Sequence, residues 1–421
     1  MLRAFRPTRT KSFHGTVAGF AMAIALAGGA AVGSAAFTSE AAYAQNSRGF
    51  AEAYQPVAEM VQPETANFEG ARAQIPTIVA AIENENDRQV AGNLILNIGN
   101  NLEDPALQRQ GLELMLESGL VPPEQVGQFN WFVGSLAYQA EDWADARAGF
   151  QAAQAAGYSE PETDLTLLIA DTYEREDNVQ GAYDYVMQAV ADAEAAGNTP
   201  PEGWLLGQLQ NSYDYENAPQ ALEVSETLLR NHPTSQNWVN ALQVINALYE
   251  FDSAQRVDLY RLMRETGALT QRPEFIRYIE DLDPRVMSNE VQKVLTLGLE
   301  TDDVFTADDP YYLEVKDIAD TRAPQDRNGI DSLISDGRSG DGLDAVSAGD
   351  VLYSIDDYAR AEELYGVALE KGYDADTVNT RIGIVQAAQG DYAGALETFE
   401  MVDGTREPIA RLWAAYARSM M

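Results

Sequence analysis

Two consecutive stretches between Leu343 and Val402 carry one residue pattern, repeated with an offset of 34 positions throughout. Each copy has a small residue, then an Asp-Tyr pair, then an alanine followed four residues later by an aromatic residue. The matching positions are Gly349, Asp357-Tyr358, Ala361, Tyr365 and Ala368, and then Gly383, Asp391-Tyr392, Ala395, Phe399 and Val402. A period of this length is typical of a helix–turn–helix unit that buries its apolar face only by stacking on neighbouring copies. The pattern therefore predicts a stack of helical hairpins.

The same pattern of a small residue followed by apolar residues recurs upstream at similar intervals. The predicted central small residues of the second helices are Ala71, Gly111, Ala146, Ala182, Ala221, Ala254, Ala361 and Ala395. A small side chain is needed at such a position because two helices cross closely there. The gap of 107 residues between Ala254 and Ala361 is expected to hold two degenerate copies. Since no strand pattern accompanies these helices, the sequence predicts an all-α fold, an α-solenoid of antiparallel hairpins.

This pattern resembles that of the tetratricopeptide repeat family, most closely over 129–157 and 342–402. The resemblance covers most of the chain after residue 45 and implies a superhelix with a concave groove lined by the first helices. The predicted organisation is a signal peptide at 1–45, N-terminal repeats at 46–271, degenerate hairpins with a Gly/Ser/Asp-rich loop at 272–341, and C-terminal repeats at 342–421. The loop is "SDGRSGDG" at 335–342, and a capping helix is expected at 408–421.

The first 45 residues have the layout of a secretory signal peptide. Four basic residues precede an Ala/Gly-rich apolar stretch at 16–37, and Ala42-Tyr43-Ala44 offers small residues for cleavage. The alternative is an uncleaved membrane anchor, because a stretch of 22 residues is long enough to span a bilayer. The low hydrophobicity of Ala and Gly favours cleavage. We therefore expect export, most simply to a bacterial periplasm, with no membrane insertion after cleavage.

The composition excludes several classes of function. The chain has no Cys, which removes disulfides, thiolate metal ligands and Cys nucleophiles. Its formal charge is −38, and removal of the first 45 residues, with four basic groups and one acid, changes it to −41. Such a charge repels nucleic acid and anionic lipid. The acidity is typical of a solubility adaptation, and a basic partner is the alternative explanation.

Groups that commonly carry catalysis are scarce. The two histidines are His14, in the predicted signal peptide, and His232, which we expect to cap a helix end before a proline. The acid pairs Asp302-Asp303 and Asp308-Asp309, and likewise Asp336 with Asp341, do not fit the ligand spacing of a helix–loop–helix calcium site. We interpret them as solvated loop acids. The sequence therefore favours a non-enzymatic protein without a metal or cofactor.

The concave groove implied by the family resemblance is the predicted binding surface. Its polar and aromatic positions would be Gln128, Trp131, Ser135, Tyr138, Asp171, Glu174, Arg175, Gln210, Tyr213, Asp214, Gln236, Gln243 and Asn246. We expect partner contacts from Trp131, Tyr138, Asp171, Arg175, Gln210, Tyr213, Gln243 and Asn246. Amides and tyrosines suit hydrogen bonding to an extended peptide or to sugar hydroxyls. A groove that is polar only because it faces water is the alternative.

Three hypotheses for function follow from these features. The leading one is a periplasmic scaffold or adaptor that binds envelope proteins or peptides, possessing no catalytic activity. A second is an enzyme acting on envelope polysaccharide, with its site in 272–341. A third is a structural spacer whose groove has no specific ligand. An enzyme requires a walled cleft with convergent carboxylates, whereas an adaptor requires only an open surface.

Overall fold

The computed structural model describes residues 46–160 and 163–421, so the predicted signal peptide lies outside the described residues. Within these two ranges the regular structure is helical, and β-type pairing is limited to one isolated antiparallel bridge between Glu160 and Thr163. Consecutive helices pack against each other along the chain, which confirms the predicted all-α solenoid of hairpins. The chain forms two compact units, the first ending at Ala191 and the second running from Asp192 to Met421.

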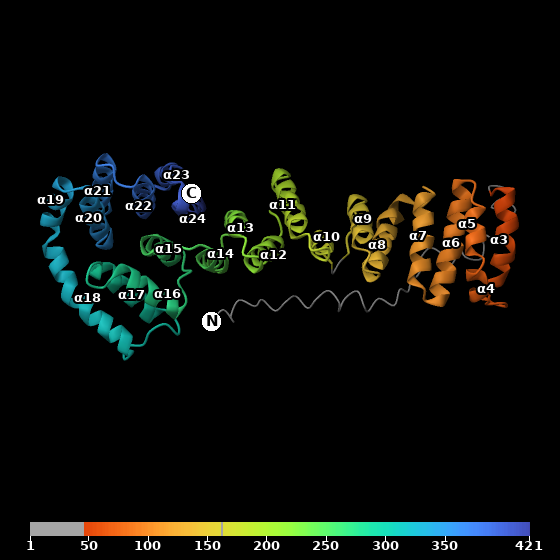
Figure 1. Ribbon diagram of the computed structural model, residues 1–421, viewed down its shortest axis with the longest axis horizontal. Helices are drawn as coiled ribbons and strands as arrows, with labels where there is room; N and C mark the ends of the chain where they lie inside the picture. The colour runs from red at the N-terminus through yellow and green to blue at the C-terminus, as the bar shows by residue number, and fades with distance from the viewer. Residues whose placement is uncertain (1–45, 161–162) are drawn as a thin grey trace. The chain divides into compact units, whose positions relative to one another are not determined.

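The first unit begins with short helices and continues in pairs of longer ones (Figure 1). Its helices are α3 (Arg48–Met60), α4 (Phe68–Arg72), α5 (Ile75–Ala80), α6 (Glu85–Leu102), α7 (Pro105–Glu117), α8 (Pro123–Gln139), α9 (Trp143–Ala155), α10 (Leu165–Glu174) and α11 (Val179–Ala195). The last of these helices crosses the boundary into the second unit. The closest pairings are α6 with α7 and α8 with α9.

Six hairpins of the described ranges share one turn geometry between their two helices. In each, a residue with positive φ directly precedes an Asp or Asn that begins the second helix. These pairs are Glu103-Asp104, Glu141-Asp142, Asp177-Asn178, Glu216-Asn217, Asp356-Asp357 and Gly390-Asp391. Except in Asp142, the side-chain oxygen accepts a backbone N–H of the second helix. The left-handed residue ends one helix and the cap starts the next, so the turn fixes the register of the pair.

Glycines of three first helices lie against aromatic rings of the second helices. The pairs are Gly134 with Phe150, Gly349 with Tyr365 and Gly383 with Phe399, each separated by 16 residues. A Cβ atom added to Gly134 or Gly349 would lie 2.7 or 2.5 Å from a ring carbon of its partner. Side-chain carbons do not approach that closely, so these helices reach their observed contact only around a glycine.

The predicted central small residues are buried in every hairpin but one. Ala146, Ala361 and Ala395 are fully inaccessible to solvent. Ala254 lies in the first turn of its helix and is only partly buried, so the predicted register is wrong there. The physical reason is a different turn, because this hairpin has an extended Tyr249 in place of the left-handed residue, and the cap of its second helix, Asp252, comes three residues later.

The second unit contains α12 to α24 and one 3₁₀ helix (Figure 1). Its helices are α12 (Glu202–Asp214), α13 (Ala218–Asn231), α14 (Ser235–Leu248), α15 (Ser253–Glu265), α16 (Arg272–Leu282), α17 (Ser288–Glu300), α18 (Pro310–Asn328), α19 (Ile330–Ser339), α20 (Gly342–Ser354), α21 (Tyr358–Glu370), α22 (Ala375–Ala388), α23 (Tyr392–Phe399), η3 (Gly404–Arg406) and α24 (Glu407–Ser419). The segment 272–341 thus supplies four regular helices to this unit.

The predicted loop at 335–342 is mostly helical. Residues 335–339 continue α19, and the chain leaves the helix only at Gly340 and Asp341. A Cβ atom at Gly337 would lie 2.9 Å from the Cβ of Ala348, so this glycine allows α19 to pack closely on α20. Tertiary packing therefore outweighs the low helix propensity of the Gly- and Ser-rich sequence. Asp341 then caps α20 by accepting the backbone N–H of Leu343 at 2.9 Å.

The C-terminal helix does not lie at an exposed end of the stack. Helix α24 packs on α23, its neighbour in sequence, and also on α13 and α15 from the start of the same unit (Figure 1). Ile409, Leu412 and Trp413 are buried as predicted, but so are Pro408, Ala410, Ala414, Ala415 and Ala417. The helix predicted at 408–421 is present and keeps a polar outer face at Glu407, Arg411 and Arg418, but it packs on helices from the start of the unit as well as on the last hairpin. The second unit closes on itself.

Candidate functional site

Three of the eight predicted groove residues are in direct contact in the first unit. The Tyr138 hydroxyl, on α8, donates to Asp171 Oδ2 on α10, and Arg175 Nε donates to the same oxygen at 3.3 Å. Trp143 of α9 lies edge-on to Tyr138, with 5.1 Å between ring centroids, and the Arg175 guanidinium lies 5.7 Å from its ring centre. All four side chains are partly exposed. We call Tyr138, Trp143, Asp171 and Arg175 the aromatic–acid cluster.

The charges of this cluster are fixed at ordinary pH. Burial raises the pKa of Tyr138, and its hydrogen bond to Asp171 raises the pKa further, so the hydroxyl remains a donor. Burial lowers the pKa of Arg175, but the attraction of Asp171 outweighs burial and the pKa is raised overall. The cluster therefore presents one hydroxyl donor, one carboxylate and one guanidinium beside two aromatic rings. It can offer hydrogen bonds and aromatic contact to a ligand.

Two aromatic residues of the predicted groove also serve the packing of their hairpin. The Trp131 ring lies 5.2 Å from the Phe150 ring and 6.0 Å from the Tyr158 ring, measured between centroids. Tyr138 lies 6.3 Å from the same Phe150. Both residues are half-buried against the core formed by α8, α9 and α10. Both rings therefore contribute to packing as well as being partly accessible, because the Phe150 ring of the second helix lies against Gly134 of the first helix and contacts them.

The other four predicted groove residues belong to the second unit and do not form a cluster. Gln210 on α12 donates to Asp214 Oδ1 of the same helix at 2.8 Å, and Tyr213 is half-buried on that helix. On α14, Asn246 lies beside the Tyr260 hydroxyl, and Gln243 lies beside the Glu274 carboxyl. Burial raises the pKa of Glu274, and the backbone N–H groups of Gln271 and Thr270, with the nearby Gln243 amide, only partly offset this rise.

A buried charge network surrounds α15 in the second unit, and the sequence did not predict it. Arg261 forms two hydrogen bonds with Glu290 of α17, from Nε at 2.9 Å and from Nη2 at 2.8 Å. Its third bond, from Nη1, goes to Asp258 Oδ1 at 3.0 Å. Tyr278 of α16 donates to Glu290 at 2.7 Å, and the Arg261 guanidinium lies 4.3 Å above the Tyr353 ring. Arg261 is 2% exposed and both of its carboxylate partners are 0% exposed.

The network extends from α15 to the C-terminal helices. Asp258 Oδ2 accepts from Arg406 Nη1 at 2.7 Å and lies 3.9 Å from Arg381 Nε. Arg381 Nη1 donates to Asp350 Oδ2 at 2.8 Å, and the Tyr365 hydroxyl donates to Asp350 Oδ1 at 2.8 Å. The chain of contacts thus joins α15, α20, α21, α22 and η3. Buried ion pairs of this kind fix a unique arrangement more than they add stability.

Electrostatic attraction keeps Glu290 and Arg261 charged. Burial alone would raise the pKa of Glu290, but Arg261 and Arg264 lower the pKa to about 2. Burial lowers the pKa of Arg261, and Glu290 with Asp258 raises it well above its ordinary value. Burial also raises the pKa of Asp350, against the attraction of Arg381. Since each acid is held by arginine or tyrosine, we assign the network to structure.

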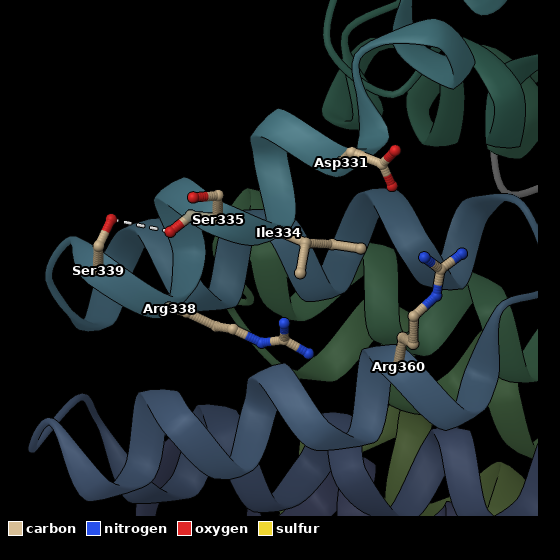
Figure 2. Close-up of a pocket in the computed structure, with 6 residues that line it drawn as sticks. All are labelled: Asp331, Ile334, Ser335, Arg338, Ser339 and Arg360. Carbon is tan, nitrogen blue, oxygen red and sulfur yellow. Dashed lines mark hydrogen bonds between the residues drawn. The ribbon is translucent and has the colours of Figure 1, made fainter.

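The segment proposed to hold an enzymatic site contributes one wall of a pocket of about 450 Å³ (Figure 2). The lining residues are Asp331, Ile334, Ser335, Arg338 and Ser339 of α19, and Arg360 of α21. Arg338 also pairs with Glu363 at 2.7 Å, and Arg360 pairs with Asp357. Asp331 is the one carboxylate of the lining, whereas glycoside hydrolysis uses two carboxylates. The pocket offers cationic and hydroxyl groups rather than a convergent acid pair.

Several of the sequence's polar candidates have local structural roles. Asp309 caps α18 by accepting backbone N–H groups of Tyr311 and Tyr312, and it pairs with Arg272. His232 ends α13, and its ring Nε2 lies 2.8 Å from the carbonyl oxygen of Pro200. Within 46–160 and 163–421, no group of three or more His, Cys, Asp or Glu residues is arranged so that it could hold a metal ion. The helices in the same ranges include none that is long and apolar enough to cross a membrane.

The sequence matches no family model and no curated protein.

Proposed function

We propose that this chain is a non-enzymatic scaffold or adaptor of the bacterial periplasm, and that it binds an envelope protein or peptide through the first unit. The aromatic–acid cluster carries the proposal. It gathers residues from α8, α9 and α10 into one partly exposed group, so a partner would contact two successive hairpins at once. Aromatic and arginine side chains in such positions commonly provide most of the binding energy of an interface.

A binding site in the first unit is supported by the arrangement of the predicted groove residues, which differs between the two units. In the second unit the four predicted groove residues are dispersed, and the interior is filled by α24 and the charge network. In the first unit the predicted residues Tyr138, Asp171 and Arg175 meet at one point. The export signal predicted at 1–45 supports a periplasmic location, and the chain has no Cys that could carry a lipid anchor after cleavage.

The experiment compares partner capture by variants that preserve packing. The double variant Tyr138→Phe with Arg175→Gln removes the polar groups of the cluster but keeps the ring against Phe150. The matched control is Tyr185→Phe, which removes the hydrogen bond of another half-exposed tyrosine to Gln154, 2.7 Å in length. After gentle cross-linking in envelope extract, wild type and control should capture the same protein, and the double variant about tenfold less of it.

The outcomes separate the three hypotheses. Equal capture by all three proteins would place the partner elsewhere on the chain. Capture of nothing specific by the wild type would favour the structural spacer. Hydrolysis of envelope polysaccharide by the purified chain, abolished by substitutions at Asp331 and Arg360 in the α19–α21 pocket, would favour the enzyme.

A further inference from the structure

The last 18 residues have a charge opposite to that of the rest of the chain. Residues 404–421, which we call the C-terminal strap, contain three arginines and one glutamate, whereas the whole chain has a formal charge of −38. The strap consists of η3 and α24 and follows a turn in which Met401 is 57% exposed. A basic helix is thus attached to an acidic body through a short exposed connection.

The strap is anchored by one tryptophan. Trp413 is 1% exposed, and its indole N–H donates to the carbonyl oxygen of Asp258 in α15 at 3.0 Å. One turn further, the Tyr416 ring lies edge-on to Trp238 of α14, with 6.2 Å between centroids. A buried aromatic side chain whose single polar group is satisfied is the usual centre of a protein–protein interface.

Arginines on the strap pair with acids on the body. Arg411 approaches Glu226 of α13 with two nitrogens, Nε at 3.1 Å and Nη2 in a second bond, and this pair is partly exposed. Arg406 binds the buried Asp258 at 2.7 Å, and the adjacent Thr405 hydroxyl accepts a hydrogen bond from Gln255 Nε2 at 2.7 Å. Bidentate arginine–carboxylate contacts provide orientation as well as energy.

These contacts have the anatomy of a complex between two molecules: a buried aromatic centre, a charged rim and opposite charges on the two sides. We infer that the strap is an intramolecular ligand of a helix-binding site formed by α13, α15, α22 and α23 with a ring contact from α14, and that a basic amphipathic helix with a tryptophan anchor is the partner that fits this site. Such a helix would compete with the strap for Asp258 and Glu226. The inference is independent of the aromatic–acid cluster, because all of its contacts lie within the second unit.

The test cuts the strap free after the full chain has folded. A protease recognition sequence is placed in the exposed turn between Phe399 and Gly404, and the purified protein is cleaved. The probe is a fluorescein-labelled synthetic peptide of residues 404–421. We expect the cut strap to remain bound on size exclusion and to exchange with the labelled peptide, while the body keeps its helical circular dichroism throughout.

Competing peptides define the specificity of the site. A peptide with Trp413→Ala should compete at least about 30-fold less well, because it lacks the buried anchor. A scrambled peptide of the same composition should not compete, which separates this site from general attraction to an acidic surface. In the body, Glu226→Gln should speed dissociation of the peptide about tenfold, because it removes the bidentate pair at the partly exposed rim.

Three results would overturn the inference. The cut strap could dissociate without rebinding while the body remains folded, or the scrambled peptide could compete equally. Alternatively, release of the strap could unfold α12–α15, as judged by hydrogen exchange of their amides, and then the strap would be part of the core rather than a ligand. The Glu226→Gln variant gives a separate test in the uncut chain. Hydrogen exchange of the α24 amides should be faster in this variant than in the wild type, and unchanged exchange would contradict the inference.

Discussion

The indole N–H of Trp413 donates to the backbone carbonyl of Asp258 across 155 residues of sequence. The carboxylate of the same Asp258 accepts hydrogen bonds from Arg261 of α15 and from Arg406 of η3. One residue of α15 thus holds both a neighbour on its own helix and the C-terminal segment. In an open stack each hairpin contacts only the next one. We therefore expect the contacts of the C-terminal segment to add to the stability of the second unit.

Replacement of Trp413 by phenylalanine should test this closure. The variant keeps an aromatic ring against Phe399 but loses the hydrogen bond to Asp258 and leaves a small void. A loss of about 2 kcal/mol in the free energy of unfolding is expected, from the unmade hydrogen bond and the lost volume. Urea denaturation checks the value, and hydrogen exchange should be faster in α24. Unchanged exchange in α24 would contradict a role of this hydrogen bond in holding the C-terminal segment.

Removing one member of the Arg261–Glu290 pair should lower the free energy of unfolding strongly, whereas replacing both members with apolar residues should lower it only slightly. Arg261→Met or Glu290→Leu alone leaves an uncompensated charge in the interior, and should cost about 3–5 kcal/mol. The double variant Arg261→Met with Glu290→Leu should recover most of that loss, because both charges leave the interior together. A double-mutant cycle by urea denaturation measures the coupling energy. Additive losses from the two single substitutions would mean that the pair does not act as a unit.

Stability should fall in acid partly through Glu290. Its pKa in the folded chain is about 2, below the ordinary value of 4.5, so its charge favours folding. This contribution is complete above about pH 4.5 and is lost as the pH falls toward 2. Glu290→Gln should therefore flatten the decline of melting temperature with pH over that interval. Asp350 provides a control of opposite sign, since burial raises its pKa, and Asp350→Asn should make the decline steeper. Parallel profiles for all three proteins would contradict this assignment.

Much of the hairpin architecture could be predicted because it depends on neighbouring residues. The glycine, the central alanine and the aromatic residue of one hairpin lie within about two helices of each other, so their spacing in the sequence records their contact. Gly383, Ala395 and Phe399 illustrate this: the pattern placed them in one hairpin, and the structure brings the glycine against the ring. Ala254 failed because its hairpin lacks the shared turn.

The charge network and the position of α24 could not be predicted in the same way. Arg261 meets Glu290 after 29 residues and Asp258 meets Arg406 after 148, so their partners depend on how the unit closes. In the sequence, the charged residues of α15 are spaced as on an ordinary solvent-exposed helix face, so nothing marks Asp258 and Arg261 as buried. The aromatic–acid cluster was partly predicted, through Tyr138, Asp171 and Arg175. Trp143 was missed as a member, although its position directly after the turn at Glu141 is a usable signal.

Two glycines give a matched test of the hairpin contact. Gly383→Ala places a methyl group against the Phe399 ring and should cost about 1–3 kcal/mol through overpacking. Gly366→Ala, on α21, meets nothing within 4 Å and should stabilise the protein by about 0.5–1 kcal/mol, because alanine favours helix. Thermal denaturation of both variants provides the comparison. Equal shifts would indicate that the Gly383 contact is looser than described.

The shared turn determines where the chain can change in length. In five hairpins the central alanine follows the left-handed residue by five positions, as in Asp356 to Ala361 and Gly390 to Ala395. An insertion within that interval would rotate the rest of the second helix by about 100° and turn its aromatic residue away from the glycine. An insertion in a connection between hairpins, such as 371–374, leaves both faces in phase. Duplication of whole hairpins could therefore lengthen this array even where the connections between hairpins change in length. For the same reason, tags or fused domains are best inserted in those connections.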